Sequence, residues 1–384
     1  MKKFTAIIIG AGGRGNQYAS IMKRMPDQFE VVGVAEPIKA RRDSIKEKFN
    51  LSEDACYPGY AEILAQPKMA DIAVICTMDD MHTEPALMAI ELGYDVLLEK
   101  PVAQTPEECI AIAQAAERKG VSVLVCHVLR YAPFYKRVKK LVMDGEIGDV
   151  VSVMAVEGVG NVHQSHSYVR GDWHREDETT PMLLAKCCHD LDILQWIVDK
   201  PCHKVTSFGK LTHFTPENAP DGAPERCFEH DCPAREECPY SCEKVYLKEG
   251  CNFMQCTAGR GYSKGFTPSL EEIKEGLRHT NFGACVYHAG NDVVDHQVVN
   301  MEFDNGVTAS LTMNAFNYGG RYIRIFGTKG ELYANASDTE ITVFSFYPRK
   351  WTKYSVVETD ETIAGGHGGG DAGLIGELYD YLSD

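Results

Sequence analysis

Short apolar runs alternate with helix-like stretches over about the first 128 residues of the chain. The apolar runs occupy residues 4–9, 31–35, 71–76, 95–98 and 121–126. Between the last two runs, Thr105 and Pro106 indicate the start of a helix and Gly120 its end. Strands that alternate with helices are typical of a parallel sheet. The pattern therefore predicts a doubly wound α/β domain, with ligands at the carboxyl ends of its strands.

From Val150 onward, the pattern changes to longer strand-like segments. Strands are expected over residues 150–156, 204–214, 297–303, 307–313, 322–326 and 331–334. Asp304-Asn305-Gly306 is a strong hairpin signal, and residues 327–330 predict a second hairpin. A helix over 182–198 is expected to pack on this sheet, which gives an α+β domain with an open, mainly antiparallel sheet. The uncovered face of such a sheet favours a partner subunit.

The second domain is interrupted at about residues 215–282 by an insertion rich in proline, glycine and charge. Within it, residues 267–272 look like a helix start. The expected division is a first domain over 1–128 and a second over 129–384, the insertion included. A helix-like run over 374–382 ends the sequence.

A glycine-rich turn follows the first strand directly. Its glycines are expected to act separately: Gly10 makes the tight turn, Gly12 lets the backbone approach a pyrophosphate, and Gly15 lets the helix pack closely on the strand. Gly13 and Arg14 complete the turn, and the free N–H groups of the helix start would hold the phosphates. The alternative is a glycine-rich turn that merely joins a strand to a helix.

The second strand ends in Glu36, which favours a dinucleotide site at the glycine-rich turn. A carboxylate at this position accepts both ribose hydroxyls of an adenosine and repels a 2′-phosphate. The sequence therefore predicts NAD as cofactor, with NADP less favoured. Arg41 and Arg42 follow closely enough to keep NADP open.

Charge and length exclude several classes of partner. The 384 residues are enough for two domains, and the formal net charge of −16 disfavours nucleic acid and anionic membranes. No apolar run approaches a membrane span, and a strand that starts at Phe4 leaves no room for a signal peptide. A cytoplasmic protein is expected, in which most of the 14 cysteines are small buried apolar residues.

Polar side chains follow two later strands at the edge where a cofactor would lie. Thr77, Asp79 and His82 are expected to hydrogen-bond the ribose or nicotinamide side, although a solvated turn is an equal alternative. Glu99 and Lys100 end the next strand. The Lys100 ammonium is expected to bind a substrate hydroxyl and to stabilise its developing alkoxide, unless it is a surface lysine paired with Glu99.

Taken together, the glycine turn, Glu36, Glu99-Lys100-Pro101 and Arg130-Tyr131-x-Pro133 resemble the Gfo/Idh/MocA family of glucose–fructose oxidoreductase-like and inositol dehydrogenase-like enzymes. The resemblance continues through residues 145–148 and 189–192 and covers the chain apart from the insertion. It implies a Rossmann domain plus an open-faced sheet domain that mediates a homodimer or homotetramer. It also implies a sugar, a sugar derivative or a polyol as substrate.

The family commonly carries an acid four residues before a histidine that faces the nicotinamide. His189 matches the histidine and Asp192 a following acid, but Ala185 replaces the usual aspartate. Lys186, three residues before His189, is expected on the same helix face and is a second candidate catalytic cation. We expect His189 to accept the hydroxyl proton, with both lysines lowering its pKa. A core histidine bonded to a backbone carbonyl is the alternative.

Several further side chains are candidates for substrate binding. Aromatic and imidazole groups suit a sugar because flat faces pack on C–H bonds while polar edges meet hydroxyls. Three of them fall in an expected loop after the first strand of the second domain, and one lies near the carboxyl end. The set consists of Arg130, Tyr131, His163, His166, Trp173, Asp192 and His367. For the loop residues, ordinary packing is the alternative.

Four cysteines lie close together in the insertion: Cys227, Cys232, Cys238 and Cys242. Four thiols within sixteen residues can form a tetrahedral zinc site. However, their spacing lacks paired C-x2-C units, and Cys285 could replace one ligand. Free thiols are the alternative, and an iron–sulfur centre is less favoured.

These features predict an NAD-dependent oxidoreductase that transfers a hydride between a sugar or polyol hydroxyl and a nicotinamide. One alternative is an enzyme that retains NAD while it oxidises a sugar, eliminates a glycosidic substituent and reduces the product. A non-catalytic sensor of NAD or sugar is a second alternative, which the presence of both Lys100 and His189 disfavours.

Overall fold

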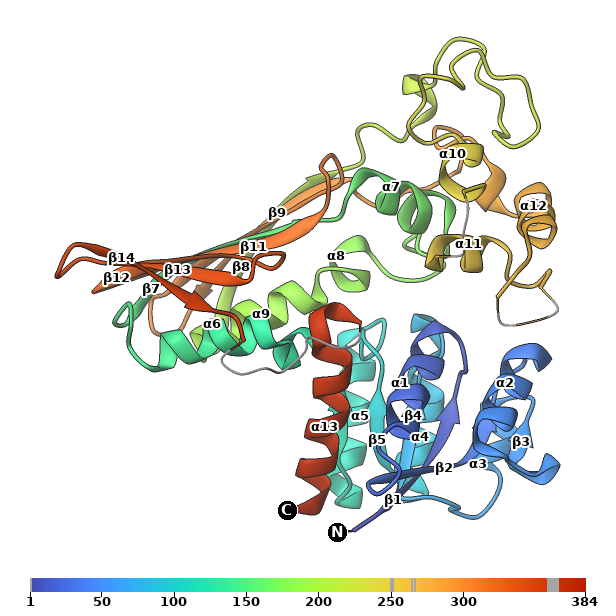
Figure 1. Cartoon of the computed structure of the whole chain (residues 1–384), viewed down its shortest axis with the longest axis horizontal. Coiled ribbons are helices and arrows are strands. Elements are labelled where there is room, and N and C mark those ends of the chain that lie inside the picture. The colour runs from blue at the N-terminus through green and yellow to red at the C-terminus, as the bar shows by residue number, and fades with distance from the viewer. Residues whose placement is uncertain (1, 249–251, 264, 266, 358–365) are drawn as a thin grey trace.

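The computed structural model describes residues 2–248, 252–263, 265, 267–357 and 366–384. The N-terminal domain contains a six-stranded sheet, in the order β3-β2-β1-β4-β5-β6, whose pairs are all parallel (Figure 1). Its strands are β1 (Phe4–Ile9), β2 (Phe29–Ala35), β3 (Cys56–Tyr57), β4 (Ile72–Ile75), β5 (Asp95–Leu98) and β6 (Val123–Val125). Its helices are α1 (Gly13–Lys23), α2 (Lys39–Phe49), α3 (Tyr60–Leu64), α4 (Thr83–Glu91) and α5 (Pro106–Lys119). The strand order reverses between β1 and β4, which makes this edge the expected ligand-binding crevice.

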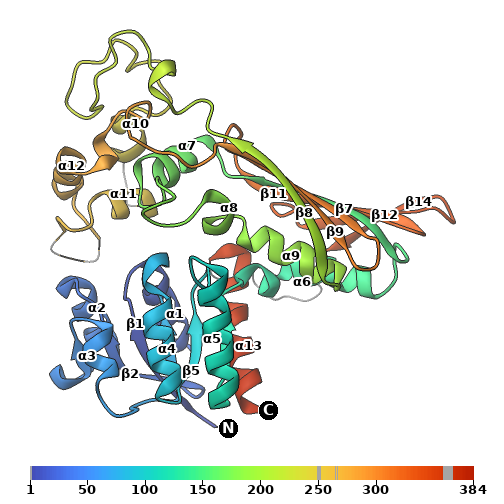
Figure 2. The same ribbon diagram turned by 180° about the vertical axis from the view of Figure 1, so that it is seen from behind.

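Alternate residues of β1 supply the cores on the two faces of this sheet. Ile7 packs in the core that includes Ala89 of α4, whereas Ile8 packs in the core on the opposite face. The chain's last helix, α13 (Gly370–Ser383), contributes Leu374 and Leu378 to the Ile8 core, and both figures place it beside this domain (Figures 1 and 2). The expected division at residue 128 therefore needs a correction, because the chain returns to the first domain at its end.

The second domain contains an eight-stranded sheet in the order β14-β13-β12-β11-β7-β10-β9-β8. Its strands are β7 (Val150–Gly158), β8 (Cys202–Lys210), β9 (His296–Phe303), β10 (Thr308–Asn314), β11 (Gly320–Gly327), β12 (Gly330–Asn335), β13 (Glu340–Ser345) and β14 (Lys350–Ser355). The pair β7–β10 is parallel and the other pairs are antiparallel, so the predicted mainly antiparallel sheet is confirmed. Both predicted hairpins, β9–β10 and β11–β12, are present. Helices α6 (Pro133–Met143) and α9 (Cys188–Val198) cover one face (Figure 2).

The helix expected over 182–198 is broken. It forms α8 (Met182–Ala185) and α9, and the backbone leaves helical geometry at Cys187, whose carbonyl accepts the first hydrogen bonds of α9. The break follows from long-range partners: Lys186 contacts Glu157 of β7, and Asp190 accepts from Arg321 of β11. The prediction that Lys186 and His189 share one continuous helix face was therefore wrong.

The insertion forms a small helical lobe with its own core. Its helices are α10 (Cys242–Tyr246), α11 (Phe253–Ala258) and α12 (Leu270–His279), the last beginning after Ser269 as predicted. Tyr246, Leu277 and Phe282 pack in its core. The segment after β7, expected as a loop, instead forms α7 (Asn161–Gln164) and a wider helical turn at Ser165–Arg170. Among the described helices, none has the length and apolar character that a membrane crossing requires.

Candidate active site

The glycine turn has the geometry that a pyrophosphate site needs. Gly10 has a φ of +86°, and a Cβ there would lie 2.6 Å from the carbonyl oxygen of Cys76. A Cβ on Gly15 would overlap the carbonyl oxygen of Gly10, so helix and strand pack as closely as expected. Gly12 precedes α1 without a side-chain cap, and a Cβ on Gly13 would meet nothing within 4 Å. The first N–H groups of α1 are therefore open to a ligand, and the turn fits a dinucleotide.

Glu36 lies beside this turn, 4% exposed at the end of β2. Its two carboxylate oxygens accept hydrogen bonds from the backbone N–H of Ala11 (2.7 Å) and of Ile38 (2.9 Å). One terminal nitrogen of Arg42, Nη1, donates to the backbone carbonyl of Glu36. Burial lowers the pKa of Arg41, which lies near Glu36 and near Arg260 of the insertion. The carboxylate is thus held rigidly at the expected ribose position.

Arg14 and Glu99, both expected at the cofactor, instead bond to each other. The Arg14 Nε donates to Glu99 (2.7 Å), and its terminal nitrogens donate to Tyr18 (2.5 Å) and to Asp371 (2.8 and 3.1 Å). Tyr18 and the Lys100 backbone N–H also donate to Glu99 (2.8 and 2.9 Å). This network ties α1 and the end of β5 to α13. Sequence patterns gave no sign of Asp371 because it lies 357 residues from Arg14.

The residues after β4 connect the two domains. Asp79 is buried and accepts hydrogen bonds from the Trp173 indole (2.8 Å) and from Thr180 (3.0 Å). Both ring nitrogens of His82 lie at backbone carbonyls, 2.6 Å from Pro101 O and 3.2 Å from Thr77 O. His82 therefore supports this loop, with its Nδ1 at the shorter distance, to Pro101 O. The Thr77 hydroxyl donates to the Met81 carbonyl (2.9 Å).

Lys100 projects from the end of β5 toward the second domain, as predicted. Its Nζ donates to the carbonyl oxygen of Ala185 (2.8 Å), the last residue of α8. The same Nζ lies 6.0 Å from the centre of the Trp173 ring. The alternative of a surface lysine paired with Glu99 does not match this placement.

His189 is buried at the start of α9, where three imidazoles meet. Its ring centre lies 5.9 Å from that of His127 and 6.0 Å from that of His367. Burial, reinforced by Lys100 and then by Arg321 and the two histidines, holds the pKa of His189 well below its ordinary value. His189 Nδ1 has no hydrogen-bond partner, which argues against a core histidine fixed by that atom.

The sequence predicted a role for His367 but not for His127. His127, immediately after β6, carried no recognisable motif, and burial lowers its pKa as well. His367 reaches the site from the carboxyl-terminal segment, as anticipated, and its Nδ1 lies 3.0 Å from Asp371. Within the described part of the chain, His127, Cys188 and His189 are the set whose metal-ligating atoms all lie within 4.8 Å of one another. The neighbouring Lys100 ammonium opposes a cation there.

Lys186 belongs to a buried network of four charges. Its Nζ lies 3.4 Å from Glu157, and Arg321 pairs with both Glu157 and Asp190 (2.8 Å each). Burial lowers the pKa of Lys186 and raises that of Glu157. Sequence reasoning missed Glu157, Asp190 and Arg321 because their partners come from separate strands. Lys186 remains near Lys100, but its charge is largely offset by Glu157.

The remaining candidates divide into two groups. Arg130 and Asp192 bond to each other in a bidentate pair (2.6 and 2.7 Å), and Tyr131 packs against the N-terminal core. His166 stacks on Phe282 of the insertion and bonds Tyr246, so it faces away from the centre. All four were expected at the substrate, yet Arg130, Asp192 and His166 make hydrogen bonds within the protein.

His163 and Trp173 remain close to the reacting centre. Burial, followed by nearby Lys186, lowers the pKa of His163 to about 3, and its ring lies 6.0 Å from that of Tyr168. The rings of Tyr168 and Trp173 are 6.2 Å apart, and Trp173 in turn neighbours Lys100. Two cations, a neutral imidazole and flat aromatic faces thus surround one region at the carboxyl edge of the first sheet.

A glycine-rich turn beside a buried carboxylate, with a lysine of the first domain near a neutral histidine of the second, is the arrangement expected of a pyridine-nucleotide-dependent oxidoreductase. The chain belongs to the Gfo/Idh/MocA family. Residues 4–127 match its "Oxidoreductase family, NAD-binding Rossmann fold" and residues 139–368 its "Oxidoreductase family, C-terminal alpha/beta domain". The predicted family, fold and enzyme class are confirmed, whereas nothing in the comparisons supports a bound zinc ion.

Three similar proteins show the range of the family. The chain is 25% identical over 377 residues to the putative oxidoreductase YteT of Bacillus subtilis, covering 94% of this chain and 84% of that protein. It is 24% identical over 211 residues to 2,7-anhydro-N-acetylneuraminate hydratase of Escherichia coli, covering 54% of each. The solved structure of levoglucosan dehydrogenase in complex with NADH matches with a TM-score of 0.69 at 17% identity, covering 99% of this chain and 89% of that one. The last likeness concerns the fold alone.

Proposed function

We propose that the protein oxidises a hydroxyl group of a sugar, sugar derivative or polyol, with NAD as the hydride acceptor. The observation that carries this proposal is the meeting of Lys100 and His189 at the carboxyl edge of the Rossmann sheet. Bound NAD supplies the electrophilic ring carbon that receives the hydride. The aromatic faces of Tyr168 and Trp173 beside these groups suit the C–H surface of a carbohydrate.

Lys100 and His189 act on the same substrate hydroxyl in this proposal. The Lys100 ammonium orients the oxygen and stabilises the alkoxide character that develops as the hydride leaves. His189, kept neutral by burial and by Lys100, accepts the hydroxyl proton. Lys186 acts indirectly, because its contact with Glu157 fixes the polypeptide between Lys100's acceptor Ala185 and His189.

His367 offers a route for the proton to leave. Its ring neighbours His189, its Nδ1 is held by Asp371, and its side chain is 37% exposed. A proton on buried His189 would be unstable beside Lys100, so transfer through His367 to solvent restores the base.

Single substitutions test the proposal. Lys100→Ala and His189→Ala should each lower kcat/KM by about 10²–10⁴-fold, while NAD affinity measured by calorimetry stays near normal. His203→Ala, on the exposed edge strand β8, is the matched control. Near-normal turnover by either active-site variant on the true substrate would disprove the assigned roles.

A second candidate is oxidation, elimination and re-reduction with NAD retained. It is favoured by Ala185, which stands where the family carries an acid, and by the relative named a hydratase. Incubation with a glycoside panel separates the two. Aglycone release with solvent deuterium incorporated into the sugar, and without net NADH, favours the second candidate, whereas stoichiometric NADH supports the first.

Within this proposal, NAD is preferred over NADP. Support comes from the Glu36 carboxylate, which is held beside the turn and would repel a 2′-phosphate. Glu36→Ala should shift the ratio of kcat/KM values toward NADP by about two orders of magnitude. Asp43→Ala, an exposed carboxylate on α2, should leave the ratio unchanged.

A homo-oligomer formed through the second sheet completes the proposal. The face opposite α6 and α9 carries a cross-strand row that includes Phe208 (72% exposed), Val298 and Tyr322. Phe208→Asp should reduce the mass measured by light scattering, whereas Ile110→Asp on α5 should not. A cytoplasmic location is supported by free thiols that are spread through both domains, among them Cys76, Cys126 and Cys187.

A further inference from the structure

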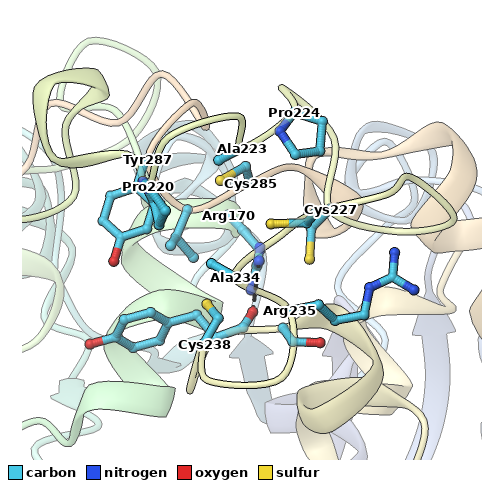
Figure 3. A pocket seen from close by; sticks show the side chains of 14 residues that line it. Arg170, Pro220, Ala223, Pro224, Cys227, Ala234, Arg235, Cys238, Cys285 and Tyr287 are labelled. Atoms are coloured by element: carbon cyan, nitrogen blue, oxygen red, sulfur yellow. Dashed lines mark hydrogen bonds between the residues drawn. The ribbon is translucent and has the colours of Figure 1, made fainter.

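Four cysteines line one small cavity where the insertion meets the segment preceding β9. They are Cys227, Cys232, Cys238 and Cys285. Figure 3 shows Cys227, Cys238 and Cys285 arranged around a common space that the end of Arg170 also reaches. The cavity has a volume of about 20 Å³, which is room for a single ion or water.

Two of these cysteines are fixed by paired backbone. Arg226 and Ala284 form an isolated antiparallel bridge, which brings the neighbouring Cys227 and Cys285 to the same place. The Cys227 N–H donates to Gly283 O and the Cys285 N–H to Glu225 O, both at 2.9 Å. This arrangement joins positions 58 residues apart (285 − 227) and explains why spacing alone did not select Cys285.

The other two cysteines lie in consecutive tight turns. The Arg235 N–H donates to the carbonyl of Cys232 (3.1 Å), and the Cys238 N–H donates to that of Ala234 (2.9 Å). The turns bring both side chains to the same cavity. Cys242, the fourth member of the expected set, does not line it.

Arg170 provides an independent sign of a negatively charged occupant. Its side chain is 2% exposed and lines the cavity. Its Nε donates to Ala284 O (2.7 Å) and its Nη2 to Tyr240 O (2.9 Å), but Nη1 has no hydrogen-bond partner. A buried guanidinium is stable only when its charge is offset. Thiolates facing it, with more negative charge than the metal they bind, supply that offset.

Cys242 contacts Cys227 but, unlike Cys227, does not line the cavity. The Cys242 backbone N–H donates to the Cys227 Sγ (3.3 Å). The Cys242 thiol donates to the carbonyl oxygen of Phe282 (3.4 Å). Cys242 therefore supports the Cys227 sulfur through its backbone N–H, while its own thiol is hydrogen-bonded to Phe282.

We propose that Cys227, Cys232, Cys238 and Cys285 bind one zinc ion in a tetrathiolate site whose charge Arg170 partly offsets. Each thiol releases its proton to solvent on binding, and the four thiolates with Zn²⁺ carry a net charge of −2. No three of these sulfurs share the 4.8 Å spacing found at His127, Cys188 and His189, so binding draws them inward. The site anchors the insertion to Arg170, at the end of the helical segment that carries His163.

The test is the metal content of the full-length protein, purified without chelator. We expect one zinc per chain by plasma mass spectrometry, and a tetrahedral thiolate spectrum after exchange with Co²⁺. Cys285→Ser and Cys238→Ser should lower bound zinc by about tenfold or more at equal free zinc. Cys242→Ala, which removes only a hydrogen-bond donor, should retain zinc, and Cys109→Ser on α5 is the matched control.

Two measurements use the unmodified protein, so their results do not depend on whether the variants fold. Chelation should make four more thiols reactive toward a disulfide reagent and should increase proteolysis within 215–282. Protein that binds no zinc when supplied with it, or that contains iron and sulfide instead, would overturn the proposal. Zinc lost in Cys242→Ala but kept in Cys285→Ser would show that the ligand set is wrong.

Discussion

The cofactor turn and the substrate centre are built in opposite ways. At the turn, six consecutive residues and one acid fix the geometry through backbone conformation, as the φ of Gly10 and the contact of Gly15 show. At the substrate centre, the backbone is broken between α8 and α9, and side chains from separate strands hold it. The first region depends on the absence of side chains, and the second depends on the balance of buried charges.

The difference explains where substitutions should act. In the turn, replacing a glycine with alanine should lower stability only where the new Cβ would touch backbone atoms. In the substrate centre, removing a charged side chain should lower stability only where its partner of opposite charge stays buried. Four predictions test this contrast, from the largest expected effect to the smallest.

Arg321→Met should destabilise the protein by about 3–5 kcal/mol, because Glu157 and Asp190 would remain buried with one cation fewer. Arg324→Met, on the same strand, removes an exposed pair with Glu331 and should cost about 0–1 kcal/mol. Urea unfolding of the two variants measures the difference. Equal destabilisation would refute the dependence on buried charge.

Gly15→Ala should lower stability by about 1–3 kcal/mol and weaken NAD binding, because its Cβ would overlap the Gly10 carbonyl oxygen. Gly13→Ala is the control within the same motif, since a Cβ there meets nothing within 4 Å. The control should be neutral or stabilising by about 0.5 kcal/mol in the absence of cofactor. Thermal denaturation without NAD distinguishes the two, and a matching loss in both would contradict the prediction.

Acid should destabilise the second domain through His166. Burial, followed by Arg170 and Arg260, lowers the pKa of His166 to about 3 in the folded state, whereas the unfolded value is about 6.5. The unfolded chain binds more protons between these values, so stability falls as the pH drops below 6.5, by about 2 kcal/mol at pH 5. His166→Gln should flatten the pH dependence of unfolding, and exposed His203→Gln should leave it unchanged.

Removing a helix cap should have the smallest effect on stability. This effect should not depend on how the cofactor turn or the substrate centre is built. Thr105 caps α5 and Ser269 caps α12, each in a complete capping box. Thr105→Ala and Ser269→Ala should each cost about 1 kcal/mol. Hydrogen exchange should locate the first loss in α5 and the second in the insertion. A cost well above this from Ser269→Ala would show that the insertion is coupled more tightly to the core.

Most of the fold could be predicted from local sequence signals. Asn305 and Gly306 located the β9–β10 hairpin, and Thr105 with Gly120 bounded α5 within the sequence itself. The site was predictable where one residue follows a strand end, as Lys100 does. Local patterns did not reveal the contacts of His82 with Pro101 and of Arg14 with Asp371, because these partners lie 19 and 357 residues away.

The unpredicted half of the site has a common physical cause. His127, Asp371 and Arg321 enter through contacts that only the folded topology creates. The helix break at Cys187 has the same origin, since nothing in the local sequence disfavours a continuous helix over 182–198. Periodicity reports local preference, and here long-range pairing of Lys186 and Asp190 overrode it.

The return of α13 to the N-terminal domain has a consequence during synthesis. The core that contains Phe4 and Ile8 is completed by Leu374 and Leu378, which are synthesised long after the strands of that core. The N-terminal domain therefore cannot close its core until the whole second domain and α13 have been translated. A nascent or truncated chain that lacks α13 would expose this apolar surface to chaperones, and it would also lack Asp371, the partner of Arg14.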